Sequence, residues 1–225
     1  MYTLCWSAKG GSGTTVVAAA LALSSARSRP TVLVDLGDDL PAALGVSAPT
    51  GPGVGEWLAA PHAAPATLVE LAVEVSPGLF LVPAGGLAAH GTIDDVQAER
   101  LAHACDRAAL STIVDAGPHG RHQVLHACAA RSLIVVRPCY LGLRRAVQVP
   151  GLATAAVVVH EPGRSLGVDD VGRALGVPVL AEIAWDPGIA RAVDAGLLTH
   201  RLPSALRSAA GRLDAHPGGR PAAAA

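Results

Sequence analysis

The residues best suited to chemistry stand together near the start of the chain, in the run CWSAKGGSGTT at 5–15. A phosphate-binding loop commonly reads G-x-x-x-x-G-K-[ST], and in that frame Thr14 stands where the lysine belongs, while Thr15 takes the hydroxyl position that binds magnesium. Losing one charge-assisted contact, worth roughly 1.5 to 3 kcal/mol, weakens nucleotide binding by about 10- to 150-fold. The loop therefore predicts phosphate binding that is weakened but retained.

Lys9, inside this loop, is the single lysine of the chain; the other basic residues, from a total of 17, are all arginine. A compact ammonium on a thin stem suits a narrow phosphate loop, whereas a planar guanidinium is not an equivalent ligand there. We interpret Lys9 as a phosphate ligand. The alternative is that the one lysine stands here by chance.

The loop must be positioned by strands and helices, which the hydrophobic pattern predicts. Short apolar runs alternate with Ala- and Leu-rich stretches, a pattern typical of a parallel sheet covered on both faces. Seven strands are expected, at 2–8, 31–36, 79–84, 111–116, 132–138, 154–160 and 178–184. The predicted fold is α/β, a doubly wound and mostly parallel sheet, with a helix over 14–28 directly behind the loop.

Two further segments complete the predicted organisation. Residues 38–65 are weakly patterned and predict a long surface loop with one short helix near 54–58. Near the end, 201–216 predicts a helix with Leu202, Leu206 and Leu213 on one face. We expect one domain over 1–215 and a disordered tail over 216–225.

Composition excludes several classes of protein. The longest purely apolar run, 16–23, is well short of the roughly 20 residues that span a bilayer. The N-terminus lacks the basic and apolar regions of a signal peptide, and the net charge of -1 gives no overall attraction to nucleic acid or anionic lipid. We expect a cytoplasmic protein whose four cysteines are reduced and mostly buried: Cys5, Cys105, Cys128 and Cys139.

Several motifs together resemble the ParA/MinD family of deviant Walker A ATPases, whose loop reads KGGxGK[ST]. The run KGGSGTT follows a predicted strand, LVDLGDDLPAALGV is similar to the family's switch region, and STIVDAGP is similar to its Walker B strand. PGLFLVPAG and GVPVLAEIAWDPGIARAVDAGLL are similar to its third-strand and base-closing segments. The resemblance covers most of the chain and implies a P-loop NTPase fold.

The resemblance also implies roles for individual residues. In the family the early lysine, matched by Lys9, reaches the partner's phosphates across a nucleotide-sandwich dimer. ATP and Mg²⁺ are the implied ligands, and Lys9 and Asp35 are the implied catalytic residues. The implied metal ligands are Thr15, Asp35 and Asp115. The implied nucleotide-binding residues are Lys9, Gly10, Gly11, Ser12, Gly13, Thr14, Thr15, His160, Asp186 and Pro187.

Three positions depart from the family pattern. Thr14 replaces the second lysine, and Gly37 stands where the second switch aspartate would orient the attacking water. Either Asp38 or Asp39 remains a candidate for that role, and His160 replaces the asparagine that reads adenine. These departures predict slow or absent hydrolysis.

The GTT ending of the loop resembles the TadZ/CpaE branch and its septum-site-determining relatives. The leading hypothesis is a dimerising, ATP-binding switch that positions a pilus, secretion or septum machinery. One alternative is an active ParA-type partition ATPase that binds DNA nonspecifically, which the scattered arginines do not favour. The other is a nucleotide-free scaffold, against which Lys9, Gly13 and Thr15 argue.

The remaining groups of polar and charged residues give no strong prediction of function. His122 and His126 stand one helical turn apart beside His119 and Cys128, and we expect a solvated helix face rather than a metal site. Arg144 and Arg145 predict plain surface charge. Asp186, before Pro187, predicts a helix cap. A membrane-surface role for the last helix is the weaker reading, because its apolar face is short.

Overall fold

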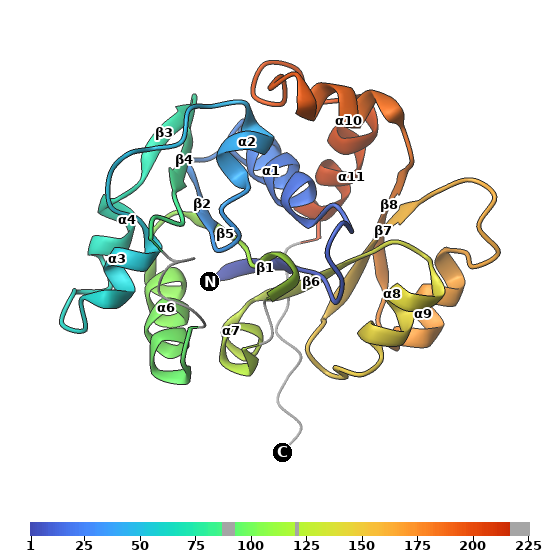
Figure 1. Cartoon of the computed structure of the whole chain (residues 1–225), viewed down its shortest axis with the longest axis horizontal. Coiled ribbons are helices and arrows are strands. Elements are labelled where there is room, and N and C mark those ends of the chain that lie inside the picture. The colour runs from blue at the N-terminus through green and yellow to red at the C-terminus, as the bar shows by residue number, and fades with distance from the viewer. Residues whose placement is uncertain (87–92, 120–121, 217–225) are drawn as a thin grey trace.

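The chain forms one eight-stranded sheet in a computed structural model that describes residues 1–86, 93–119 and 122–216 (Figure 1). The strand order is β3-β4-β2-β5-β1-β6-β7-β8, and every described pairing is parallel except that of β3 with β4. The strands are β1 Tyr2–Trp6, β2 Thr31–Asp35, β3 Val73–Ser76, β4 Leu79–Val82, β5 Ser111–Asp115, β6 Arg131–Val136, β7 Ala155–His160 and β8 Val179–Ala184.

Helices cover both faces of this sheet, which confirms the predicted doubly wound architecture (Figure 1). One face carries α1 Thr14–Ser25, α2 Leu40–Leu44, α10 Pro187–Asp194 and α11 Ser204–Asp214. The other carries α3 Val54–Ala59, α4 Thr67–Glu70, α6 Asp95–Arg107, α7 Gln123–Cys128, α8 Tyr140–Ala146 and α9 Val168–Leu175. A short 3₁₀ helix, η1 Gly117–His119, follows β5.

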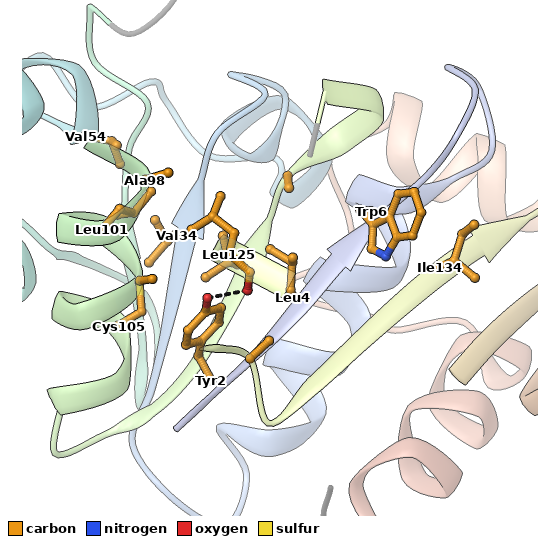
Figure 2. Packing of buried hydrophobic residues seen from close by; sticks show 14 of the residues in the cluster. Tyr2, Leu4, Trp6, Val34, Val54, Ala98, Leu101, Cys105, Leu125 and Ile134 are labelled. Carbon is orange, nitrogen blue, oxygen red and sulfur yellow. Dashed lines mark hydrogen bonds between the residues drawn. The ribbon is translucent and has the colours of Figure 1, made fainter. Parts of the chain in front are cut away.

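The central strand β1 divides two hydrophobic cores. Leu4 and Trp6 point into the core beneath α6 and α7, as Figure 2 shows, while Cys5 points into the core beneath α1 and α11. The hydroxyl of Tyr2 donates to the Leu125 carbonyl and ties the start of the strand to α7. A strand buried on both faces is a rigid base for the loop that leaves its carboxyl end.

All seven predicted strands are present, and the structure adds an eighth. The extra strand, β3, pairs antiparallel with β4 at the edge of the sheet. Its sequence, VEVS, is short and leaves Val73 and Glu74 exposed, so it lacks the apolar run that marked the other strands. An edge strand with one free side needs no such run.

The segment 38–65 is more ordered than the sequence predicted. The short helix expected near 54–58 is present as α3, but α2 precedes it and buries Leu40 and Leu44 completely. These two leucines stand one helical turn apart, but α2 is too short to show a periodic hydrophobic pattern.

The final helix agrees with the prediction. In α11, Leu206 and Leu213 are buried, and the helix packs on α1 and β8, while Leu202 lies before its first turn and is half-buried. Of the predicted tail, only His216 lies within the described residues. None of the helices in the described ranges is long and apolar enough to cross a membrane.

Candidate phosphate-binding site

The loop between β1 and α1 is held by its own serines. The hydroxyls of Ser7 and Ser12 both donate to the Lys9 carbonyl, at 3.0 and 2.8 Å. Gly13 has a φ of 91°, a left-handed conformation that favours glycine, and α1 begins after it without a side-chain cap. The first N–H groups of α1 are therefore available to an anion, as in other phosphate-binding helix starts.

Thr14 and Thr15 open the helix with two hydroxyls in different surroundings. Thr14 is only 5% exposed, and its Oγ1 has no hydrogen-bond partner in the described part of the chain. Thr15 is half-buried, and its side chain lies close enough to Asp115 to lower the pKa of that carboxyl. A buried hydroxyl left without a partner costs about 1–3 kcal/mol, so Thr14 is suited to donate to a ligand oxygen.

Asp115 ends β5 and is fully buried. Its Oδ1 accepts the N–H of Gly117 at 3.1 Å, but its Oδ2 has no partner among the described residues. Burial, together with the charges of Asp35 and Asp39, raises the pKa of this carboxyl to about 7, although hydrogen bonding by Thr15 and Gly117 opposes the shift. An oxygen that is buried, acidic and unpaired is suited to a cation or its bound water.

Asp35 lies beside Asp115, since the two are register partners on β2 and β5. Its oxygens are occupied: Oδ1 accepts N–H groups of Gly37 and Asp38, each at 2.9 Å, and Oδ2 accepts that of Leu40 at 3.1 Å. Burial raises its pKa to about 6, against the effect of these bonds. Asp35 therefore holds the turn into α2. In its predicted metal and catalytic roles, its oxygens would have to bind a metal ion or water while they also accept these backbone N–H groups.

The two candidates for the missing switch aspartate differ in position. Asp38 has a φ of 64°, is exposed and acts electrostatically on Asp35. Asp39 is also exposed, but its charge reaches Asp115. Neither carboxylate is held in place by a described hydrogen bond, so both stay candidates for the role.

A cavity of about 290 Å³ extends from the loop along α1 to α10. Its apolar lining includes Val16, Val159 and Ile183, while Asp186 stands at its edge. Asp186 caps α10 as predicted, with its Oδ1 accepting the N–H of Gly188 at 2.7 Å, and Pro187 is the first residue of that helix. The cavity is in the place where the sequence predicted a nucleotide base.

His160 lies differently from the prediction. The side chain of Val159 lines the cavity, so its neighbour His160 points to the opposite face of the sheet, where Nδ1 is 3.3 Å from Oε1 of Glu182. Its geometry gives no support to a base-reading role, because side chains alternate along a strand and the asparagine-like position falls on the wrong face.

Lys9 is half-buried, and no carboxylate of the described residues lies within ion-pair distance of it. It lines a smaller cavity of about 80 Å³ together with Ser12 and Arg137. Arg137 also lines the larger cavity, where its guanidinium stacks over Trp185. Neither Arg137 nor Trp185 was predicted from the sequence, where the available signal was that Trp185 directly precedes the predicted Asp186 cap.

One member of the histidine cluster, His126, does not lie on a solvated helix face, while Cys128 is exposed and His122 is half-buried. His126 is 5% exposed, its Nδ1 is 2.7 Å from the Ser132 hydroxyl, and its ring meets Trp6 edge-on with centroids 4.8 Å apart. The expectation was wrong for His126 because α7 turns this side chain toward the core. Within the described residues no group of three His, Cys, Asp or Glu side chains could hold a metal. Arg144 and Arg145 are exposed on α8, as expected.

The cysteines follow the prediction in part. Cys5 and Cys105 are buried, and burial raises the pKa of each thiol to about 12. Cys128 is exposed and Cys139 is intermediate, and all four are free thiols. Only two of the four are core residues, so the expectation of mostly buried thiols is met in part.

Comparisons with known proteins identify the fold. No protein-family model matches the chain, and no curated protein matches it in sequence. Among solved structures, the cell division ATPase MinD of Pyrococcus furiosus matches with a TM-score of 0.75 and 20% identity over 95% of this chain and 98% of that one. The septum site-determining protein MinD of Pyrococcus horikoshii, complexed with Mg-ADP, gives 0.73 and 20% over 94% and 93%.

A ParA family ATPase from Chlorobium tepidum gives a TM-score of 0.73 and 20% identity over 93% of this chain and 95% of that one. The chain therefore has the ParA/MinD-type ATPase fold across nearly its whole length. Its topology places the carboxyl ends of β2, β5 and β1, and the loop that follows β1, next to one another in the middle of the sheet.

Proposed function

We propose that this chain is a nucleotide-binding switch that holds Mg-ATP in the loop between β1 and α1. The observation that carries the proposal is Asp115, a fully buried carboxylate whose Oδ2 is unpaired in the described chain and whose neighbour is Thr15. A buried carboxylate oxygen without a partner lowers the folding free energy gain, unless a ligand or cation pairs with it. The unpaired hydroxyl of Thr14 supports the same function from the loop side.

The residues present fit a hydrated Mg²⁺ ion. Thr15 and Asp115 offer the hard oxygen ligands that this ion prefers, and Mg²⁺ keeps several waters when it binds proteins. When bound, the ion would neutralise charge on the phosphates. The N–H groups at the start of α1 and the Thr14 hydroxyl would bind phosphate oxygens, while Asp35 keeps the neighbouring turn in shape through its three backbone bonds.

Hydrolysis is expected to be slow or absent. Gly37 brings no side chain to the place where an aspartate would orient water, and Asp38 and Asp39 are exposed. General acid–base groups contribute typically 10²- to 10⁴-fold when positioned, and an unheld surface carboxylate loses much of that effect.

The active form in this proposal is a dimer. Lys9 has no described ion-pair partner in its own chain, which leaves its ammonium available to the phosphates of a second copy. The ATP-bound dimer would recruit and position a pilus, secretion or septum machinery. The ParA/MinD-type fold and the GTT loop ending support this role.

Titration calorimetry with Mg-ATP tests the proposal. We expect Asp115→Asn to weaken binding by about 10- to 150-fold in the presence of Mg²⁺, and much less in its absence. Asp106→Asn is the matched control, because Asp106 is exposed and pairs with the N-terminus. Binding that is unchanged in Asp115→Asn, or absent in the wild type, would refute the proposal.

Light scattering and phosphate release on the same samples test the dimer and the slow turnover. We expect Mg-ATP to double the mass of the wild type but not of Lys9→Ala, with little phosphate released. A wild type that stays monomeric with saturating Mg-ATP would contradict the dimer.

A partition-type ATPase is the second candidate function, because arginines that are far apart in the sequence lie close together in the structure. A cavity of about 570 Å³ between α1 and the start of α11 is lined by Arg27, Arg201 and Arg207, with no acidic residue in its described lining. Such a surface suits nucleic-acid phosphates. ATP-dependent retention on DNA that falls steeply with salt, and is lost in the Arg201→Ala/Arg207→Ala variant, would favour this function.

A further inference from the structure

Arg137 lies directly beside the phosphate loop. It follows β6, and its Nη1 is 3.5 Å from the carbonyl oxygen of Gly11. Its guanidinium also lies over the Trp185 ring, 4.5 Å from the centroid. Arg137 thus connects the loop to the segment between β8 and α10, 48 positions later in the chain.

Arg137 lines both cavities that border the loop, the small one beside Lys9 and the larger one that reaches α10. A cation in this position is close to any phosphate bound against Gly11, Ser12 and Gly13. The cavities themselves therefore place its charge where a polyphosphate would lie.

The loop needs a cation from its own chain. Thr14, at the lysine position, offers a neutral hydroxyl. Arg164 also lines the small cavity, but it is engaged by Glu161, with its Nε 2.9 Å from Oε2. Arg137 has no carboxylate within ion-pair distance among the described residues. Its charge acts on Glu161 only from a longer distance, and Glu161 is already bonded to Arg164.

We propose that Arg137 supplies, from the same chain, the positive charge that the loop lacks at Thr14, and that it binds the phosphates of a nucleoside di- or triphosphate. Trp185 is the positioning residue, because an aromatic face holds a planar guanidinium while leaving its N–H edge free for phosphate oxygens. This inference rests on the proposed nucleotide binding and adds to it the group that compensates the altered loop.

The test compares ATP with inorganic tripolyphosphate, which carries the phosphates but no base. We expect Arg137→Ala to weaken both ligands by about tenfold or more, with a similar fold-change for each, as for a lost charge-assisted contact. Arg137→Lys, which keeps the charge, should lose less. Arg144→Ala is the matched control, because it removes an exposed arginine of α8 that lines neither cavity. Thermal unfolding of each variant verifies that it is folded.

Salt dependence gives a second measure. The affinity of Arg137→Ala for tripolyphosphate should fall less steeply with salt than that of the wild type, since one fewer charge contacts the ligand. Trp185→Ala should weaken both ligands by a smaller factor than Arg137→Ala, and Trp185→Phe should recover most of that loss.

The possible results distinguish the role of Arg137 from the proposed nucleotide binding on which it rests. A wild type that binds neither ATP nor tripolyphosphate overturns both. A wild type that binds both, with Arg137→Ala binding equally well, overturns only the role of Arg137. A loss confined to ATP would mean that the Arg137 and Trp185 pair contacts the base, and it would also overturn the proposed phosphate contact.

Discussion

The two sides of the phosphate loop are built differently. On the carboxylate side, Asp35 and Asp115 end the neighbouring strands β2 and β5 and are fully buried. On the cavity side, Trp185 is 42% exposed, and α10 has no fully buried residue. The first side lies near the middle of the sheet beneath α1 and α2, and the second lies beside the edge strand β8.

This difference separates two tasks. Burial at the carboxylate side strengthens electrostatic interactions and preorganises the oxygens that would meet a metal, at a cost in folding free energy. The cavity side is anchored by fewer buried side chains, so we expect it to have the lower local stability of the two. The two sides meet where α2 contacts the end of α10, through Gly45 and Gly196.

The largest expected effect tests the burial of Asp115. Because its folded-state pKa is raised to about 7, its ionisation opposes folding, so its contribution to the unfolding free energy falls as pH rises from about 4 to 7. We expect Asp115→Asn to match the wild type near pH 4 and to be more stable above pH 7, by on the order of 4 kcal/mol. Urea denaturation across this range measures it.

The control is Asp106→Asn, which should follow the wild-type curve at every pH. Mg-ATP should narrow the gap above pH 7, because a cation stabilises the ionised carboxylate. Parallel curves for the wild type and Asp115→Asn from pH 4 to 8 would mean that the two sides of the loop do not differ in this way.

The next effect tests the contact between the two sides. A Cβ at Gly45 would lie 2.0 Å from the carbonyl oxygen of Gly196, so Gly45→Ala should cost about 3 kcal/mol or more of unfolding free energy. Gly176→Ala is the matched control: this glycine also ends a helix with a positive φ, but nothing lies within 4 Å of its Cβ position, so about 1 kcal/mol is expected. Equal losses would show that α2 and α10 are not in close contact.

A smaller effect concerns the carboxylate that the switch lacks. A Cβ at Gly37 would meet only Asp35 Oδ1, at 3.9 Å, so a longer side chain can be accommodated there. We expect Gly37→Asp to raise Mg-ATP-dependent phosphate release by about tenfold or more, through an added group that orients water. Gly37→Asn adds the same bulk without the charge and should stay at the wild-type rate. An equal increase in both variants would refute this explanation.

The smallest effect sharpens the contrast in burial between two tryptophans. Trp185→Ala should lower the unfolding free energy by less than about 1 kcal/mol, since the ring is half-exposed and its main described contact is Arg137. Trp6→Ala, which removes a ring only 1% exposed, should cost about 3–5 kcal/mol. Denaturation of both variants measures the two losses, and a large loss for Trp185→Ala would show that the cavity side is as firmly packed as the core.

Sequence patterns predicted the parts of this protein that local information specifies. Seven of the eight strands, the loop after β1 and the helix behind it follow from apolar runs and glycines that are close in sequence. Among the elements that were missed, β3 and α2 are four and five residues long, and both are stabilised by neighbours that the local pattern does not contain.

The sequence predicted which residues belong to the candidate site better than it predicted their hydrogen bonds and side-chain directions. Asp35 and Asp115 appear equivalent in sequence, each ending an apolar run, yet of the two only Asp115 has an oxygen without a partner among the described residues. His160 stands at the end of its strand as expected, but the alternation of side chains turns it from the cavity. Arg137 lies in none of the quoted motifs, and Trp185 lies in the base-closing segment without a predicted role.

The sequence by itself therefore determined the fold class, the order of the strands along the chain and the residues of the loop, because hydrophobic period and glycine placement act over a few positions. Only the tertiary structure decided which carboxylate is free, which way His160 points and that Arg137 meets Trp185. Those outcomes depend on hydrogen bonds and burial between strands far apart in the chain, which no local pattern records.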